Sequence, residues 1–332
     1  MRRLSHLYFL RVLTLGLFIT SVVEAAPESE QGTLSVVFEN DLFYGTDRNY
    51  TNGIRAAWLS GPKEPANWVS RVAGHFPLFP DGANLRLSYA VGQSMYVPTD
   101  ISVANPARGE RPYAGWLYGS VGAIAESDDQ LDQLQLTVGI IGPASLARQT
   151  QEFVHDITGS DAPKGWDTQL KNELGVVLTY QRSWRQFESG SVLGFSFDLT
   201  PHAGAALGNV FTYANTGMTL RLGHRLTDDY GPPRIQPSLP GSGFFVPQDG
   251  VSWYLFAGVE GRAVARNIFL DGNSFRDSRS VDKHPLVADF QFGLAINFDD
   301  IRLSYTHVLR SPEFEGQNLR DNFGALSLSV RF

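Results

Sequence analysis

The sequence predicts an all-β fold: a closed antiparallel transmembrane β-barrel of about 12 strands, with a short helix in an exterior loop. Segments of about ten residues alternate apolar and polar side chains, and this is the length that a tilted strand needs to cross a bilayer. Aromatic residues make up 12% of the chain, whereas charged residues reach only 18%, below the roughly 25% of soluble domains. Beyond the first 25 residues, no apolar run approaches the ~20 residues of a membrane helix.

The first residues predict export. Arg2 and Arg3 precede an apolar run over 7–23, and the small residues that end it, in "VVEAA", are typical of a cleavage site. The alternative is a retained helical anchor. We therefore predict a signal peptide at 1–25 and a single outer-membrane β-barrel domain at 26–332. The chain contains no cysteine, so disulfides play no part in its stability.

Period-two alternation defines the individual strands. In "HPLVADFQFGLAINF", for example, Phe290 and Phe292 fall on one face while Asp289 and Gln291 fall on the other. The expected strands are 32–40, 51–60, 83–94, 112–125, 130–141, 172–186, 190–204, 209–224, 251–265, 285–298, 300–311 and 321–332. An even number brings both termini to one side of the membrane, and closure removes unpaired strand edges.

The expected topology separates exterior from inner connections. With the N-terminus inside, the exterior connections are 41–50, 95–111, 142–171, 205–208, 266–284 and 312–320. Inner turns should be short, and 126–130 and 187–190 fit this expectation. The inner connections 61–82 and 225–250 are long, and we expect them to form surface loops with their own packing.

The longest exterior connection predicts a helix over 144–159. Apolar residues recur at helical spacing, and Gln151 and His155, which are i and i+4, share one face. Gly159 follows at a plausible C-cap position. A helix in an exterior loop is unusual for a passive channel.

Oxygen-bearing side chains gather at the first exterior connection. They are Glu39, Asn40, Asp41, Asp47, Asn49, Thr51 and Asn52. Such oxygens suit calcium, although the same residue types also suit turns. Strand parity places His155 on the same side of the membrane. A neutral imidazole beside a bound cation is suited to activating water; the alternative is an ordinary polar histidine of an exposed loop.

Four blocks of sequence resemble a known family. They are "ENDLFYGTDRNYTNG" (39–53), "ERPYAGW" (110–116), "GIIGPAS" (139–145) and "TQEFVH" (150–155). In this order they resemble the LpxR family of outer-membrane lipid A 3'-O-deacylases, across essentially the whole exported chain. The resemblance implies a twelve-stranded barrel, calcium-dependent removal of acyl chains from the 3' position of lipid A, and an active site between the barrel wall and an exterior-loop helix.

The resemblance also implies the site. The catalytic residues by position are Asn40, Asp41, Thr51 and His155, and Asp41 would hold the Ca²⁺. We expect support from Gln151, Asp161, Glu110 and Arg111. Arg48, Arg108, Arg111 and Arg148 are candidates for contacts with the lipid A phosphates.

The expected protein is therefore a carboxylic ester hydrolase embedded in the bacterial outer membrane. Its partner is lipid A, or whole lipopolysaccharide, in the outer leaflet. We expect a monomer with no nucleic-acid partner. The competing hypotheses are a non-enzymatic channel or adhesin, and a barrel phospholipase or protease.

Overall fold

The computed structural model describes residues 31–41, 49–61, 71, 74, 76–80, 82–127, 129–237, 243–318 and 320–332, and only the backbone of Asn49 and Thr51. The predicted signal peptide lies outside these residues. Within them, no helix has the length and apolar character needed to cross a membrane.

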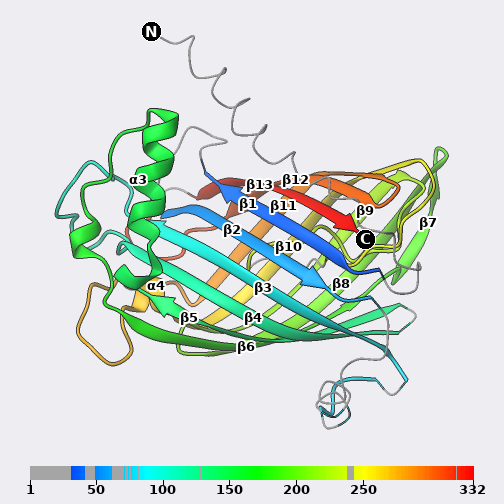
Figure 1. Cartoon of the computed structure of the whole chain (residues 1–332), viewed down its shortest axis with the longest axis horizontal. Helices are drawn as coiled ribbons and strands as arrows, with labels where there is room; N and C mark the ends of the chain where they lie inside the picture. Colours follow the sequence, from blue (N-terminus) through cyan, green and yellow to red (C-terminus); the bar gives the residue numbers. More distant parts are fainter. Residues whose placement is uncertain are drawn as a thin grey trace.

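The described chain is mostly strand (Figure 1). The strands are β1 (Thr33–Asn40), β2 (Asn49–Leu59), β3 (Asn84–Val97), β4 (Ala114–Ser127), β5 (Gln130–Ile141), β6 (Glu173–Trp184), β7 (Glu188–Val192), β8 (Phe195–Gly208), β9 (Phe211–His224), β10 (Val251–Asn267), β11 (Leu286–Phe298), β12 (Ile301–Arg310) and β13 (Asp321–Arg331). The helices are α3 (Ala147–Thr158) and α4 (Ile268–Asp271), with 3₁₀ turns η4 (Pro143–Ser145) and η5 (Trp166–Thr168).

Twelve of these strands close into an antiparallel barrel, which confirms the predicted fold. Strands that are neighbours in sequence pair with each other around the wall. The pairings of β1 with β13 and of β6 with β8 close the barrel. The helix α3 and the C-terminus lie at opposite ends of the barrel (Figure 1), and we call the α3 end the exterior end, following the predicted topology. Both termini of the barrel therefore lie on one side, as predicted.

The predicted turn at 187–190 is wrong. The chain leaves β6 at Trp184 and continues along β8 as β7, whose residue Glu188 pairs with Leu199. It turns only at Leu193 and Gly194, which both have positive φ angles, 51° and 83°. Two consecutive residues of this kind form the two-residue hairpin turn that matches strand twist, so the turn forms there and β7 extends beyond the closed wall.

The predicted alternation of inward and outward side chains is confirmed. In β11, alternate residues from Leu286 to Phe298 are exposed on the outer surface, and the residues between them, such as Asp289 and Gln291, are buried inside. β1 behaves likewise, with Leu34 and Val36 outward. The outward set forms the apolar surface that a membrane requires.

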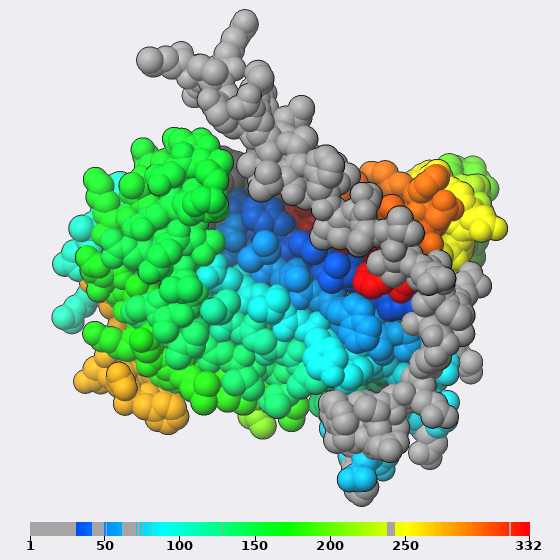
Figure 2. All heavy atoms as spheres, viewed as in Figure 1, coloured from blue at the N-terminus to red at the C-terminus, as the bar shows by residue number. Residues whose placement is uncertain are grey.

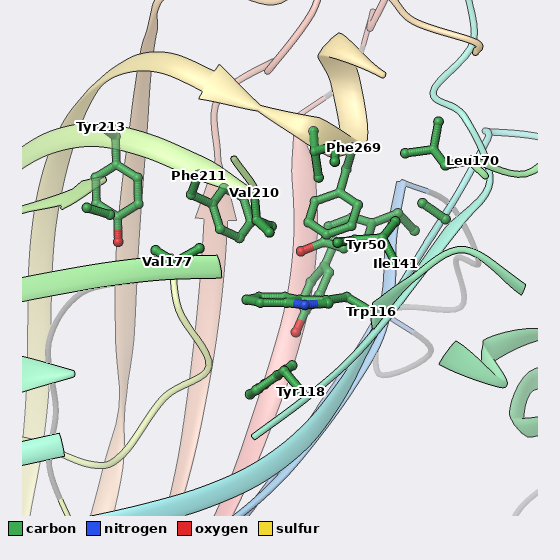
Figure 3. Packing of buried hydrophobic residues seen from close by; sticks show 14 of the residues in the cluster. Tyr50, Trp116, Tyr118, Ile141, Leu170, Val177, Val210, Phe211, Tyr213 and Phe269 are labelled. Carbon is green, nitrogen blue, oxygen red and sulfur yellow. The ribbon is translucent and has the colours of Figure 1, made fainter. Parts of the chain in front are cut away.

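Aromatic side chains fill the exterior half of the barrel interior. Tyr50, Trp116, Phe211 and Phe269 belong to one buried cluster, drawn from β2, β4, β9 and α4 (Figure 3). The ring centroids of Trp116 and Phe269 lie 6.2 Å apart, and those of Phe211 and Phe269 5.5 Å apart. Strands on opposite sides of the wall thus meet across the interior, which disfavours the open-channel hypothesis.

The long inner connection 225–250 packs inside the barrel, so the prediction of a surface loop is wrong in the part that the structure describes, 225–237 and 243–250. Asp229 is fully buried and accepts hydrogen bonds from Arg221 of β9 and from Arg302 of β12, the latter at 3.2 Å. Arg234 reaches Glu39 of β1, with Nε 2.7 Å from Oε1. Inward-facing arginines of the wall need buried partners, and this segment, which we call the inner plug, supplies one.

Removal of the Asp229 carboxylate should destabilise the barrel strongly. Asp229→Ala leaves the guanidinium groups of Arg221 and Arg302 without this buried carboxylate, and such a change costs about 3–5 kcal/mol. Urea titration of the refolded protein measures the free energy of unfolding. The control is Asp249→Ala in the same segment, whose side chain is exposed and should change stability by less than about 0.5 kcal/mol. Equal effects of the two changes would contradict the role assigned to Asp229.

Candidate active site

A row of residues crosses the outer surface of the wall at its exterior end. Asn40 of β1 pairs with Asn52 of β2, Asn52 with Met95 of β3, and Met95 with Gly115 of β4. Asn40 has the parity of the outward residues Leu34 and Val36, and it is nevertheless only 4% exposed. Two amide side chains thus lie on the lipid-facing side of the barrel, where apolar residues are the rule.

The loop helix α3 starts at the far end of this row. A Cβ atom on Gly115 would lie 2.2 Å from Cβ of Ala147 and 2.2 Å from Oγ of Ser145, so only glycine permits this approach. Gln93 of β3 donates from Nε2 to the carbonyl oxygen of Ser145 at 2.7 Å. The predicted helix 144–159 is confirmed as η4 followed by α3, and Gly159 caps it with φ 71°.

The length of α3 from Ala147 to His155 is similar to the width of this row from Gly115 to Asn40. Gly115 and Asn40 are separated by three inter-strand spacings, or about 14 Å. Ala147 and His155 are eight residues apart on α3, or about 12 Å along its axis. Figure 1 shows α3 crossing the direction of the strands from the β5 side toward the β1 side. The two lengths are similar, so we expect α3 to bring His155 toward the region where β1 and β2 end.

The face of α3 turned to the barrel consists of Ala147, Gln151 and His155, all buried. Nδ1 of His155 lies 2.5 Å from the backbone carbonyl oxygen of Asp161. Because a carbonyl only accepts, Nδ1 is the protonated nitrogen and Nε2 carries the lone pair of the neutral ring. Gln151 accepts a 2.8 Å hydrogen bond from Nε1 of Trp166. Both side chains are therefore held in fixed orientations.

The β1–β2 end has two unusual features. Asp41 directly follows β1, and its side chain is only 2% exposed. The pairing of β2 with β3 skips Thr51, since Tyr50 pairs with Tyr96 and Asn52 with Met95. This is a β-bulge at Thr51, a device that redirects side chains and is common beside active sites. The side chain of Thr51 and residues 42–48, which include Asp47 and Arg48, lie outside the described residues.

The oxygen donors at this end suit a hard cation. A carboxylate from Asp41 and amide oxygens from Asn40 and Asn52 are the ligand types of calcium, which takes six to eight oxygens. Within the described ranges, no three His, Asp or Glu side chains form a metal-binding group. The donor chemistry therefore fits calcium with one carboxylate, completed by amide and backbone oxygens.

The supporting residues predicted at the second exterior connection lie elsewhere. Glu110 accepts a hydrogen bond from the backbone N–H of Thr99 and braces its own loop. Arg111 is 1% exposed and forms a 2.5 Å ion pair with Glu313. Burial raises the pKa of Glu313, but Arg111 and Arg310 outweigh it and hold this pKa below its ordinary value, so the pair is charged at neutral pH. Arg111 thus braces the inner side of the barrel mouth.

Asp161 contacts His155, as expected, but it does so through its backbone carbonyl, while its side chain is exposed. Arg148 pairs with Glu152 and Asp167, and Arg108 is exposed.

Sequence reasoning missed the residues that seat the helix, which are Gln93, Met95, Gly115 and Trp166. One of them had a signal in the sequence. Gln93 continues the outward series of β3 after Tyr89 and Val91, so a polar residue stands where lipid-facing parity requires an apolar one. A side chain of that kind is expected to be covered by another part of the chain.

Comparison with solved structures and families agrees with this architecture. The structure of LpxR from Salmonella typhimurium matches with a TM-score of 0.73 at 20% identity, covering 90% of this chain and 100% of that one. This likeness shows the fold. The β domain of the Bordetella autotransporter BrkA matches with a TM-score of 0.43 at 8% identity, covering 91% and 98%. The translocator domain of the autotransporter NalP from Neisseria meningitidis matches at 0.38 and 9% identity, covering 99% and 96%.

No curated protein matches the chain in sequence. A family model described as "Outer membrane protein LpxR" matches residues 12–332, nearly the whole chain. The four sequence blocks, the closed barrel and the family match agree with one another. The chain therefore belongs to the LpxR family of outer-membrane proteins.

Proposed function

We propose that this protein is a calcium-dependent esterase that removes the 3'-linked acyl chains of lipid A in the outer leaflet. Its membership of the LpxR family supports an outer-membrane lipid A deacylase. The 3' position, the calcium requirement and the catalytic histidine are the finer parts of the proposal. They rest on the four sequence blocks and on the packing of α3 against the outer side of the wall.

One observation carries the proposal: the buried face of α3, which includes His155, packs on the outer side of the wall, where Asn40 and Asn52 also lie. An active site for a soluble substrate would open to water or to the barrel interior. Here the interior is filled by the aromatic cluster and the inner plug. A lipid ester in the outer leaflet can instead approach sideways between α3 and the end of β1, and this is the route that a bilayer substrate requires.

His155 would act as the general base. With its proton on Nδ1, held by the Asp161 carbonyl, Nε2 accepts a proton from water as that water attacks the ester carbonyl. The same nitrogen then returns the proton to the departing sugar oxygen. Gln151 and Trp166 hold the helix face that carries the ring. The amide of Asn40 would donate a hydrogen bond to the developing oxyanion, with Thr51 in support.

Asp41, with amide oxygens beside it, would hold the calcium ion. Bound by Asp41 and these amide oxygens, the ion would supply Lewis-acid polarisation of the ester carbonyl. The carboxylate of Asp41 is buried at the end of β1, and a cation is favourable next to a buried carboxylate. The chain would thus supply the base from α3 and the cation ligand from the end of β1.

Mass spectrometry of lipid A tests the proposal. Expression of the protein in a host that lacks it should convert lipid A to a species that has lost its 3'-linked acyl chains, and excess chelator should stop the conversion in isolated membranes. Unchanged lipid A would favour a channel or adhesin. Loss of acyl chains from phospholipids instead would favour a barrel phospholipase, and either result would overturn the proposal.

A further inference from the structure

The helix α3 has an exposed apolar flank that the active site does not use. Phe153 is 64% exposed, Leu146 52% and Ile157 44%. Phe153 and Ile157 are i and i+4, so they lie on one side of the helix, and Leu146 immediately precedes the first turn of that side. Three large apolar side chains in a row are unusual for a helix in water.

The opposite flank of α3 is polar. Arg148 pairs with Glu152 at 2.8 Å and with Asp167 of the following exterior loop, also at 2.8 Å. At 100° per residue, the polar flank lies about 80° from the centre of the buried face, whereas the apolar flank lies about 140° from it and so points away from the wall. The polar flank is thus turned toward the exterior loop, and the apolar flank is turned away from it.

The barrel fixes how these flanks lie relative to the membrane. The helix rests on the outer side of the wall at Gly115, and the wall below it presents lipid-facing side chains such as Val91 and Val138, which are 57% and 40% exposed. In Figure 2 α3 and its loop form a green ridge at one end of the molecule, beside the blue and cyan strands of the wall. The flank that faces away from the exterior loop therefore continues the lipid-facing surface of the barrel.

We propose that α3 is an interfacial helix whose apolar flank of Leu146, Phe153 and Ile157 inserts into the outer leaflet. Amphipathic helices of this kind lie in the membrane plane, with the apolar side about 5–10 Å into the boundary between headgroups and acyl chains. α3 crosses the direction of the strands (Figure 1), as such an orientation requires. The occupant of the flank is the acyl region of the leaflet.

This insertion would also position His155. Because His155 lies on the same helix as the apolar flank, insertion would hold the imidazole near the depth of the lipid esters. The proposed deacylase would then work best on lipid A in a bilayer. Insertion is nevertheless a property of the helix alone and is measured without any deacylation, so its failure is distinguishable from a failure of the proposed function.

Spin labelling tests the insertion, and the absence of cysteine from the chain makes each label unique. Phe153→Cys and Glu152→Cys are neighbours on opposite flanks and form a matched pair; Ile157→Cys and Asp156→Cys form a second pair. Each variant carries a nitroxide and is refolded into bilayers of lipopolysaccharide and phosphatidylethanolamine. Collision with oxygen, which concentrates in lipid, is compared with collision with a water-soluble nickel chelate.

Labels at 153 and 157 should collide with nickel several-fold less often than labels at 152 and 156, and more often with oxygen. Nickel collision as frequent at 153 and 157 as at 152 and 156 would show the flank in water and overturn the proposal. Protection of 153 and 157 from both reagents would show that protein covers the flank, and would overturn it equally. If Phe153→Cys fails to fold, the second pair gives the same reading.

Discussion

His155→Gln should lower the rate of deacylation by at least about 10²-fold, the lower end of what general base catalysis contributes. Glutamine retains much of the bulk of histidine and can donate to the Asp161 carbonyl, which lies 2.5 Å from Nδ1 of His155, but it cannot take up a proton. The loss should therefore fall on kcat, with KM little changed, because substrate binding along the wall is unaffected. Acyl release from detergent-dispersed lipid A measures both constants.

Two further variants serve as controls for this result. His155→Ala should be as inactive as the glutamine variant. Gln149→Ala, an exposed position on the same helix, should retain the full rate. Heat-modifiable migration in electrophoresis confirms that each barrel is folded. A glutamine variant with near-normal kcat would remove His155 from the chemistry and leave it as a structural residue of α3, although the barrel would stand.

Much of the wall could be predicted from the sequence, because a membrane strand obeys a strict local rule. Each outward residue must be apolar, and the two-residue period makes the face of every position readable. The alternation in β11 and the polar inward residues Asp289 and Gln291 follow from this rule alone. The turn after β6 could not be predicted in this way, since its position depends on the pairing of Glu188 with Leu199 across the hairpin.

The inner plug could not be predicted from the sequence, for a related reason. Inward positions are polar both in water-filled barrels and in plugged ones, so Arg221 and Arg302 alone do not reveal which case applies. Their partner Asp229 lies in a connection with no alternation of its own. Only the closed wall brings these three residues together, and a single sequence contains no record of that contact.

The candidate active site could be predicted in part. The residue types were predictable, because oxygen donors beside β1 and a histidine on a loop helix suit the chemistry. Their separation across the wall was not, since it depends on where α3 is seated. Gly115 sets that position through a close approach to Ala147, and glycine is common enough in barrel strands that its position alone carries no such signal.

Asp41→Ala should abolish deacylation, the largest effect expected for any single change in this protein. Its carboxylate is buried at the end of β1, and it is the one charged ligand that we assign to calcium. Loss of a charged ligand weakens binding of a hard cation sharply. Because Asp41 lies outside the strands, the variant should still form a heat-modifiable barrel.

Calcium binding gives this prediction a readout that is independent of activity. In the wild-type protein, calcium at 100 times its dissociation constant should raise the free energy of unfolding by about 2.7 kcal/mol, and Asp41→Ala should lose that increment. The matched control is Asp100→Ala, an exposed exterior carboxylate that accepts hydrogen bonds from Ser102 of its own loop; it should keep both the increment and the activity. Deacylation by Asp41→Ala in excess chelator would exclude the calcium mechanism. An unchanged calcium increment in that variant would place the cation away from Asp41 and would remove the assignment of the end of β1 as the cation site.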